Sequence, residues 1–93
     1  MDKKEARAIV TAKLAEYRTQ SYTELQRLLT TQDIFETTGK SGKWYQMEFY
    51  AVWDDKPNEN LRVFGNIDDG GIRAFFPLGE CFIMAPDGSF VGE

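Results

Sequence analysis

A chain of 93 residues, of which 42% are hydrophobic and 14% aromatic, is long enough for one folded domain and too apolar to be disordered. Its net charge of −4 is uneven: residues 1–30 carry six Lys/Arg against four acids, whereas residues 31–93 carry five bases against eleven acids. A surface for nucleic acid needs clustered Lys/Arg, so the acidic part of the chain argues against nucleic acid as a partner.

One cysteine and no histidine restrict the chemistry further. Cys81 can form neither an intramolecular disulfide nor a multi-cysteine zinc site. Without a histidine it lacks the usual partner of a catalytic thiol, and its place in the apolar run 81–85 predicts a small buried side chain. The N-terminus lacks the apolar core of a signal peptide, and no run is long enough to cross a membrane. We therefore expect a soluble, cytoplasmic protein without membrane contact.

The first third of the chain has the pattern of helices. Residues 2–19 carry one apolar stripe at helical spacing, followed by a capping box in which Ser21 is the N-cap and Glu24 lies three residues on. This predicts a second, short helix over 22–30, unless both segments form one long helix kinked near Gln20. The stripe consists of Ala6, Val10, Leu14 and Tyr17.

From residue 33 onward the apolar residues alternate, which is typical of antiparallel strands joined by tight turns. Strands are predicted at 34–38, 43–53, 61–67 and 72–78, followed by a small hairpin or a strand with a curled tail at 82–85 and 89–91. The predicted fold is α+β, a single domain over 1–93. One or two N-terminal helices (2–30) pack on an antiparallel sheet of about four strands (33–91). A helix followed by a four-strand meander is also the order of cystatin-like folds.

The turn at Asp69-Gly70 suits a type I′ hairpin, which would fix the register of its two strands. On this reading Pro77 marks a strand end or edge, because proline cannot donate to the ladder. The expected core pairs are Ile67 with Ile72, Gly65 with Ala74, Val63 with Phe76, and Leu61 with Leu78. The expected pairs on the opposite face are Phe64 with Phe75, Asn66 with Arg73, and Arg62 with Pro77.

The face of the sheet away from the helices is the best candidate site. If Trp53 pairs with Leu61, then Tyr50 lies beside Phe64, and Gly65 lies under Phe49. Aromatic residues together with arginine are enriched at protein interfaces. The predicted partner-binding residues are Glu48, Tyr50, Arg62, Phe64, Arg73 and Phe75. In the alternative interpretation the aromatic pairs only stabilise the sheet, or residues 82–91 fold over them.

Two acidic pairs, Asp54-Asp55 and Asp68-Asp69, lie at predicted strand ends and could be near one another. Paired carboxylates can bind a divalent cation or act as acid and base. Aspartate is also common in turns, and neither pair matches the sequence pattern of a calcium-binding loop. We therefore expect solvated turns, and we predict no catalytic, metal-binding or cofactor-binding residue.

Five segments of the chain are distinctive: residues 49–55 with Trp53-Asp54-Asp55-Lys56-Pro57; Ile67-Asp68-Asp69-Gly70-Gly71; Arg73-Ala74-Phe75-Phe76-Pro77-Leu78; residues 85–93; and Ser21-Tyr22-Thr23-Glu24-Leu25. These segments resemble those of a family of small uncharacterised bacterial proteins, some of them similar to orphan reading frames carried on mobile gene cassettes. The resemblance covers roughly the last two-thirds of the chain. It implies a compact bacterial protein and brings no activity, cofactor or catalytic residue.

The leading functional hypothesis is a non-enzymatic protein-interaction module that binds a protein partner or a second copy of itself. One version is an acidic antidote or immunity-type protein that neutralises a basic partner. The alternative is a small-ligand binder with an apolar pocket between helix and sheet. That pocket would be lined by Met47, Phe49, Trp53 and Phe76, with Tyr17 or Tyr22 as a polar group. A metal-dependent enzyme using the acidic pairs is a third hypothesis.

Overall fold

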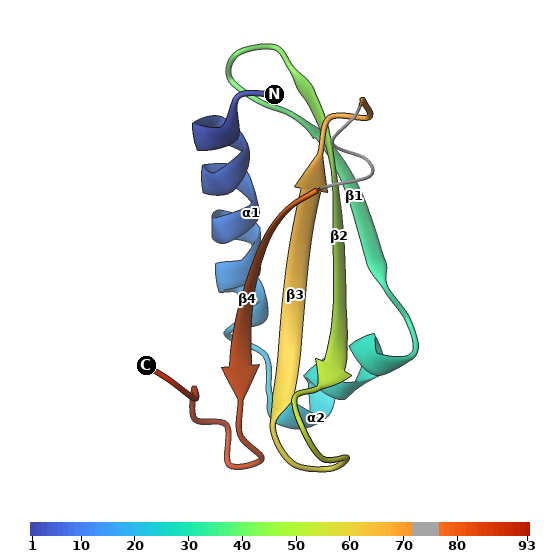
Figure 1. The fold of residues 1–93 in the computed structure, drawn as a ribbon, viewed down its shortest axis with the longest axis vertical. Helices are drawn as coiled ribbons and strands as arrows, with labels where there is room; N and C mark the ends of the chain where they lie inside the picture. The colour runs from blue at the N-terminus through green and yellow to red at the C-terminus, as the bar shows by residue number, and fades with distance from the viewer. Residues whose placement is uncertain (72–76) are drawn as a thin grey trace.

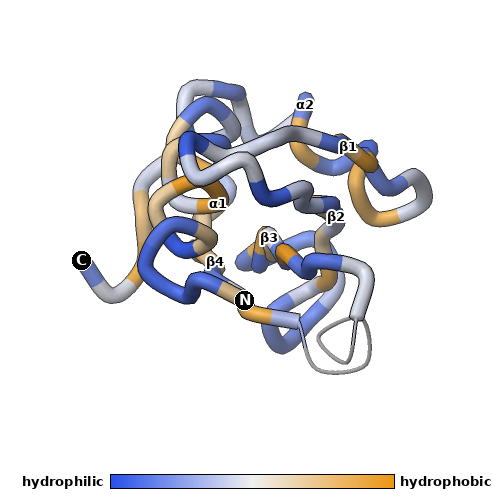
Figure 2. Tube along the Cα trace, turned by 90° about the horizontal axis from the view of Figure 1, so that it is seen from above, coloured by the Kyte–Doolittle hydropathy of each residue, from blue (hydrophilic) through white to orange (hydrophobic). Residues whose placement is uncertain are grey.

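The computed structural model describes residues 1–71 and 77–93, and it confirms the α+β fold. Two N-terminal helical segments pack on one face of a four-stranded antiparallel sheet with strand order β1-β2-β3-β4 (Figure 1). Seen from above, the sheet curves from β4 to β1 around the side on which α1 and α2 lie (Figure 2). The elements are α1 (Lys3–Tyr17), α2 (Tyr22–Leu25), the 3-10 helix η1 (Gln26–Leu29), β1 (Asp33–Thr38), β2 (Trp44–Trp53), β3 (Leu61–Asp68) and β4 (Leu78–Met84).

The helices form where capping and apolar spacing predict them. The Asp2 carboxylate accepts a hydrogen bond from the Glu5 amide at 3.0 Å and thereby caps α1. The predicted apolar stripe is the buried face of this helix. Ser21 and Glu24 form the complete capping box, with Ser21 in extended conformation. The chain therefore breaks between two helices, and the single kinked helix is wrong.

The two central strands, β2 and β3, supply seven of the fifteen buried residues of the core in the described part of the chain. Tyr45, Met47, Phe49 and Ala51 of β2 are buried and face the helices. Trp53 pairs with Leu61 and Phe49 with Gly65, as predicted. A Cβ atom on Gly65 would lie 2.5 Å from Phe49 Cε1, so only glycine leaves room for the ring above it.

The predicted register of the second hairpin is wrong. β3 pairs with β4 so that Ile67 lies opposite Leu78, Gly65 opposite Glu80, Val63 opposite Phe82, and Leu61 opposite Met84. On the other face Phe64 lies opposite Cys81, Asn66 opposite Gly79, and Arg62 opposite Ile83. The predicted partners Ile72, Arg73, Ala74, Phe75 and Phe76 lie outside the described residues.

Two local features explain this difference. A type I′ turn needs a positive φ at Asp69, yet among the described residues only Asn58 and four glycines have one. The alternation in 78–84 also places Phe82 and Met84, both large and apolar, on the core face. Pro77 directly precedes β4, which confirms it as a strand end.

The C-terminal segment forms the predicted small hairpin. The amide of Ala85 donates to the Ser89 carbonyl at 2.8 Å, and Met84 forms an antiparallel bridge with Phe90. Phe90 packs against the core, with its ring edge-to-face on Phe82 at 5.7 Å. The end of the chain therefore adds to the helix-covered side of the molecule.

Candidate functional site: the outer sheet face

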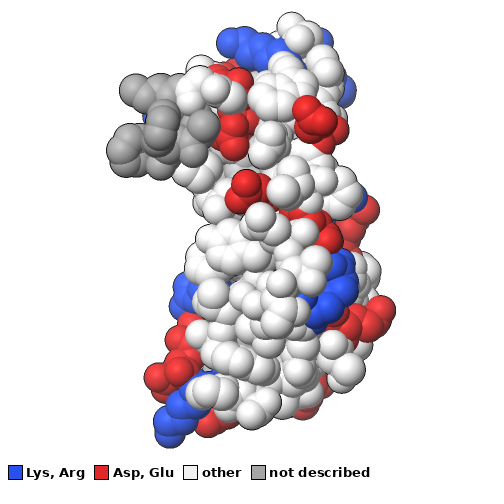
Figure 3. All heavy atoms as spheres, turned by 90° about the vertical axis from the view of Figure 1, so that its right-hand side faces the viewer, with Lys and Arg blue, Asp and Glu red and all other residues white. Residues whose placement is uncertain are grey.

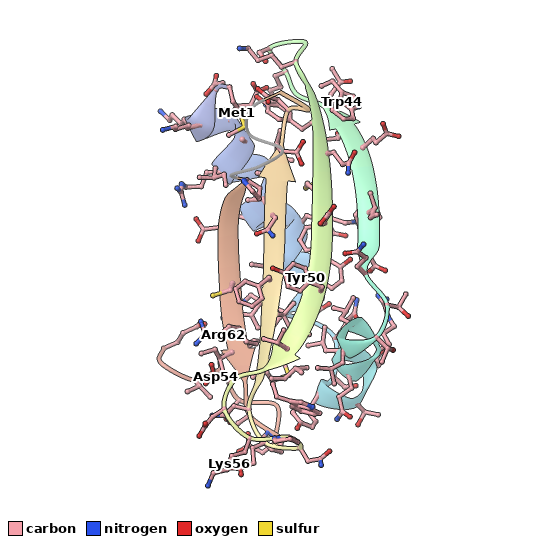
Figure 4. The ribbon with its side chains drawn as sticks, turned by 45° about the vertical axis from the view of Figure 1, so that its right-hand side comes forward. Met1, Trp44, Tyr50, Asp54, Lys56 and Arg62 are labelled. Carbon is pink, nitrogen blue, oxygen red and sulfur yellow. The ribbon has the colours of Figure 1, made fainter. Side chains whose placement is uncertain are left out.

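The face of the sheet turned away from the helices, here called the outer face, carries every second residue of each strand. In Figure 4, Tyr50 and Arg62 lie on the side of the sheet turned to the viewer, and α1 lies behind it. The outer face consists of Ile34, Glu36 and Thr38 of β1, Trp44, Gln46, Glu48, Tyr50 and Val52 of β2, Arg62, Phe64, Asn66 and Asp68 of β3, and Gly79, Cys81 and Ile83 of β4. Among these, Ile34 is 53% exposed and Val52 41%.

A stacked aromatic pair lies in the middle of this face. The rings of Tyr50 and Phe64 are 5.2 Å apart between centroids and tilted by 21°. Asn66 Nδ2 donates to the Tyr50 hydroxyl at 3.5 Å, and the Arg62 guanidinium lies 6.0 Å from the Phe64 ring centroid. The predicted neighbourhood of Tyr50 and Phe64 is confirmed.

Arg62 is held by a second partner at the end of the sheet. Its Nε and Nη2 donate to Asp54 Oδ1 at 2.9 and 2.6 Å, and this hydrogen-bonded carboxylate raises the pKa of Arg62. Figure 4 shows both side chains together at the lower end of the sheet. Because its charge is balanced by Asp54, Arg62 does not give this face a net positive charge.

The acidic residues of the outer face lie toward its other end. Glu36 and Glu48 form no ion pair among the described residues, and Asp68 accepts a hydrogen bond from the Gly70 amide at 2.8 Å. Figure 3 shows a broad uncharged area on this side of the molecule, with Asp and Glu side chains above it and charges of both signs around its border. The surface is therefore aromatic at its centre and acidic at one end.

Four of the six predicted partner-binding residues lie on this face, namely Glu48, Tyr50, Arg62 and Phe64. Arg73 and Phe75 lie outside the described residues. The interpretation in which residues 82–91 fold over the aromatic pair is wrong, because Phe82 and Phe90 pack on the core side.

The prediction that Cys81 is buried is also wrong. Cys81 is exposed on the outer face, and its Sγ accepts from Arg62 Nη1 at 3.8 Å. The reason is the strand period: Phe82 is turned into the core, so its neighbour Cys81 must point the other way. The alternation of apolar residues along 78–84 was the pattern from which the outward position of Cys81 could have been predicted.

In comparisons with protein-family models, with curated proteins and with solved structures, nothing matches this chain. The resemblance to small bacterial proteins stays a prediction.

Two shallow hollows flank Tyr50. One, of about 370 Å³, is lined by Tyr50, Phe64, Asn66, Gly79, Glu80 and Cys81. The other, of about 400 Å³, lies between residues 28–32 and residues 50–52 of β2. Tyr50 thus lines both hollows and lies between them.

The residues expected to line an interior pocket fill the core instead. Met47 and Phe49 are buried, and the Tyr17 ring stacks on Phe49 at 4.7 Å. Trp53 is half-buried beside Tyr22, with the two rings 6.5 Å apart. Phe76 lies outside the described residues.

The two acidic pairs do not come together. Asp54 follows the end of β2, where Trp53 meets Leu61, whereas Asp68 lies at the opposite end of the same hairpin, beside Gln46. Within residues 1–71 and 77–93, no three His, Cys, Asp or Glu side chains are close enough to hold a metal ion. The helices of this part of the chain are also too short or too polar to span a membrane.

Proposed function

We propose that this chain is a non-enzymatic, acidic protein-binding module that binds a basic protein partner on its outer sheet face. One observation carries the proposal. Both helices and the C-terminal hairpin pack on the same side of the sheet, so no described helix or hairpin covers the Tyr50–Phe64 pair and the acidic residues beside it.

The composition of this face supports protein binding rather than simple sheet stabilisation. Tyrosine supplies a large contact area with few rotatable bonds and a hydroxyl for a hydrogen bond. Two exposed apolar side chains, Ile34 and Val52, lie in the rows of the sheet on either side of the stacked pair. A contiguous apolar area with a polar border is typical of an interaction site.

The charge of the outer face supports a partner that is basic rather than a second copy of the chain. Glu36, Glu48 and Asp68 lie in adjacent rows of the face. Stacking two identical faces would bring these like charges toward one another, whereas a basic partner would be attracted and steered to them. An acidic antidote or immunity-type protein is one biological role that this chemistry fits.

The test is a charge reversal with a matched control. Wild-type protein, Glu48→Lys and Glu16→Lys are used to capture binding proteins from cells of the source organism, and the captured partner is purified for titration calorimetry. Glu16 lies on α1, away from the outer face, and its side chain is 67% exposed. Both variants change the net charge equally, so only the position of the change differs.

We expect Glu48→Lys to weaken binding at least about tenfold and Glu16→Lys to leave it nearly unchanged. Wild-type affinity should fall steeply as salt rises, because salt screens exposed charges. Equal affinities of the two variants would refute the outer face as the binding surface. A complex indifferent to salt would remove the electrostatic argument for a basic partner.

A further inference from the structure

The hydrogen bonds of the sheet show which edge of β2 is left unpaired. The Asp54 amide donates to the carbonyl of Asn60 in the β3 direction at 2.9 Å, and the Gly39 amide donates to the carbonyl of Lys43 at 2.8 Å. Backbone groups of successive strand residues point to opposite sides. Even-numbered residues of β2 therefore bond toward β3, and odd-numbered residues, such as Phe49, bond toward β1.

Ala51 continues this pattern beyond the reach of β1. β1 begins at Asp33, which lies opposite Phe49, and the chain before it swings away from β2 toward η1 (Figure 1). The N–H and C=O of Ala51 are thus directed at the side where β1 would have continued. No hydrogen bond from Ala51 to this side is present among the described residues.

The space in front of Ala51 is a hollow rather than a flat surface. It is the 400 Å³ hollow between residues 28–32 and 50–52, here called the β2 notch. Its volume is comparable with that of small ligand pockets, which start at about 300 Å³. Ala51 is only 5% exposed, so its backbone groups lie at the floor of the notch. The outer edge of β4 differs, since there the Val91 amide already covers the Ile83 carbonyl at 2.9 Å.

We infer that the β2 notch binds an extended segment of the partner polypeptide, which adds a short strand to β2 by pairing its backbone with Ala51. The inference rests on the proposed function and specifies how the partner binds. An N–H and a C=O from the same residue, pointing the same way, are complementary to another backbone in extended conformation. In the notch, a strand from the partner would lie beside β2 at the place that a longer β1 would have occupied.

The side chains around the notch define the segment. The partner residue opposite Ala51 would share its face and contact Leu28 and Leu29, so an apolar side chain fits there. The residues before and after it would project to the outer face beside Tyr50 and Val52. Basic side chains at these positions can reach Glu48. The preferred ligand is an extended segment with one apolar residue between basic ones.

The experiment selects ligands from a phage-displayed library of random linear peptides and measures the affinity of a selected synthetic peptide for three proteins. These are the wild type, Ala51→Pro and Thr38→Pro. Proline removes the amide donor and is tolerated where that amide lies at an edge outside the ladder. Thr38 directs its amide to the free edge of β1 and is uncharged, so the same substitution there is the matched control.

We expect Ala51→Pro to weaken peptide binding at least about tenfold and Thr38→Pro to bind like the wild type. In wild-type protein the Ala51 amide should exchange hydrogen faster than the Phe49 amide, and the peptide should slow it at least about tenfold. This exchange measurement decides the question even if Ala51→Pro fails to fold. Strand addition is overturned if no peptide is selected, if bound peptide leaves the Ala51 amide unprotected, or if Thr38→Pro is the variant that loses binding.

The two proposals fail in distinguishable ways. One outcome is that Glu48→Lys weakens binding of the captured partner while folded Ala51→Pro binds it like the wild type. This result would support binding on the outer face and refute strand addition to β2. If Glu48→Lys and Glu16→Lys bind that partner equally well, the outer-face proposal fails, and strand addition fails with it.

Discussion

The two faces of the sheet are built from the same strands and differ in almost every physical respect. Phe49 and Tyr50 are neighbours in β2, yet Phe49 is fully buried and packs against the rings of Tyr17 and Phe35, whereas Tyr50 stacks on one ring among the described residues, that of Phe64. The inner face holds helix and sheet together, whereas the outer face is the surface on which the proposed partner would bind. A strand period of two thus directs alternate residues to the core and to the outer face.

Polar contacts follow the same division. On the inner side the Glu5 carboxylate accepts hydrogen bonds from the Ser41 amide and the Tyr45 hydroxyl, both at 3.0 Å, and thereby ties α1 to β2 and the loop before it. Burial raises the pKa of Tyr45 to about 12. On the outer side Arg62 and Asp54 belong to one hairpin, so their pair links no separate layers.

The strongest test of this comparison removes one aromatic ring from each face. Phe49→Ala should lower the free energy of unfolding by about 3–5 kcal/mol, because it leaves a cavity in the packed core. Phe64→Ala should lower it by only about 1 kcal/mol, the scale of one exposed aromatic pair. Urea denaturation followed by circular dichroism measures both values. Equal losses would mean that the outer face is as much a part of the core as the inner one.

Two glycine substitutions, one on each face of the sheet, compare the faces again with a smaller expected loss of stability. Gly65→Ala places a methyl group 2.5 Å from the buried Phe49 ring, and the crowding should cost about 1–3 kcal/mol of unfolding free energy. Gly79→Ala places one 2.7 Å from the Asn66 side-chain oxygen, which can rotate away, so the loss should stay within about 0.5 kcal/mol. Thermal unfolding of the two variants gives the difference, and a larger loss for Gly79→Ala would contradict the assignment of the two faces.

The sequence predicts the part of the fold that depends on local pattern and short connections. The helix stripe, the capping box and the pairing of Trp53 with Leu61 follow from spacing and a short loop. The position of β4 does not, because residues 72–78 and 78–84 both alternate in a way that suits a core strand, and Asp69-Gly70 suits a type I′ turn that the chain does not form. The error for Cys81 has another source, since the apolar run 81–85 suggests burial while the strand period turns Cys81 away from the core. The β2 notch could not be predicted from the sequence either, because it depends on where β1 begins relative to β2.

An acidic group at the helix–sheet boundary gives the next prediction. Arg27 donates to both carboxylate oxygens of Asp33, at 2.9 and 2.8 Å, and these bonds, with a further one from the Tyr17 hydroxyl, hold the Asp33 pKa below its usual value near 3.9. The stability that this group contributes is present above the unfolded-state pKa and is lost as the pH falls through the lower folded-state pKa.

Asp33→Asn should therefore lower the free energy of unfolding by about 1 kcal/mol at pH 7, after discounting for its partial exposure. The difference from the wild type should shrink between about pH 5 and pH 2, which urea denaturation at several pH values can follow. Glu36→Gln on the outer face is the matched control, with almost no effect at pH 7 expected. A difference that stays constant with pH would show that the Asp33 charge does not stabilise the fold.

The smallest expected effect concerns Cys81, which the apolar run predicts to be buried and the structure places on the outer face. Its side chain is exposed beside Arg62, so Cys81→Ser should change the free energy of unfolding by less than about 0.5 kcal/mol. The thiol should also react with a water-soluble thiol reagent in the folded protein, at a rate similar to that in urea-unfolded protein. A thiol that reacts only after unfolding would place Cys81 in the core and reverse the faces of β4. The inward positions of Phe82 and Met84 would then also be wrong.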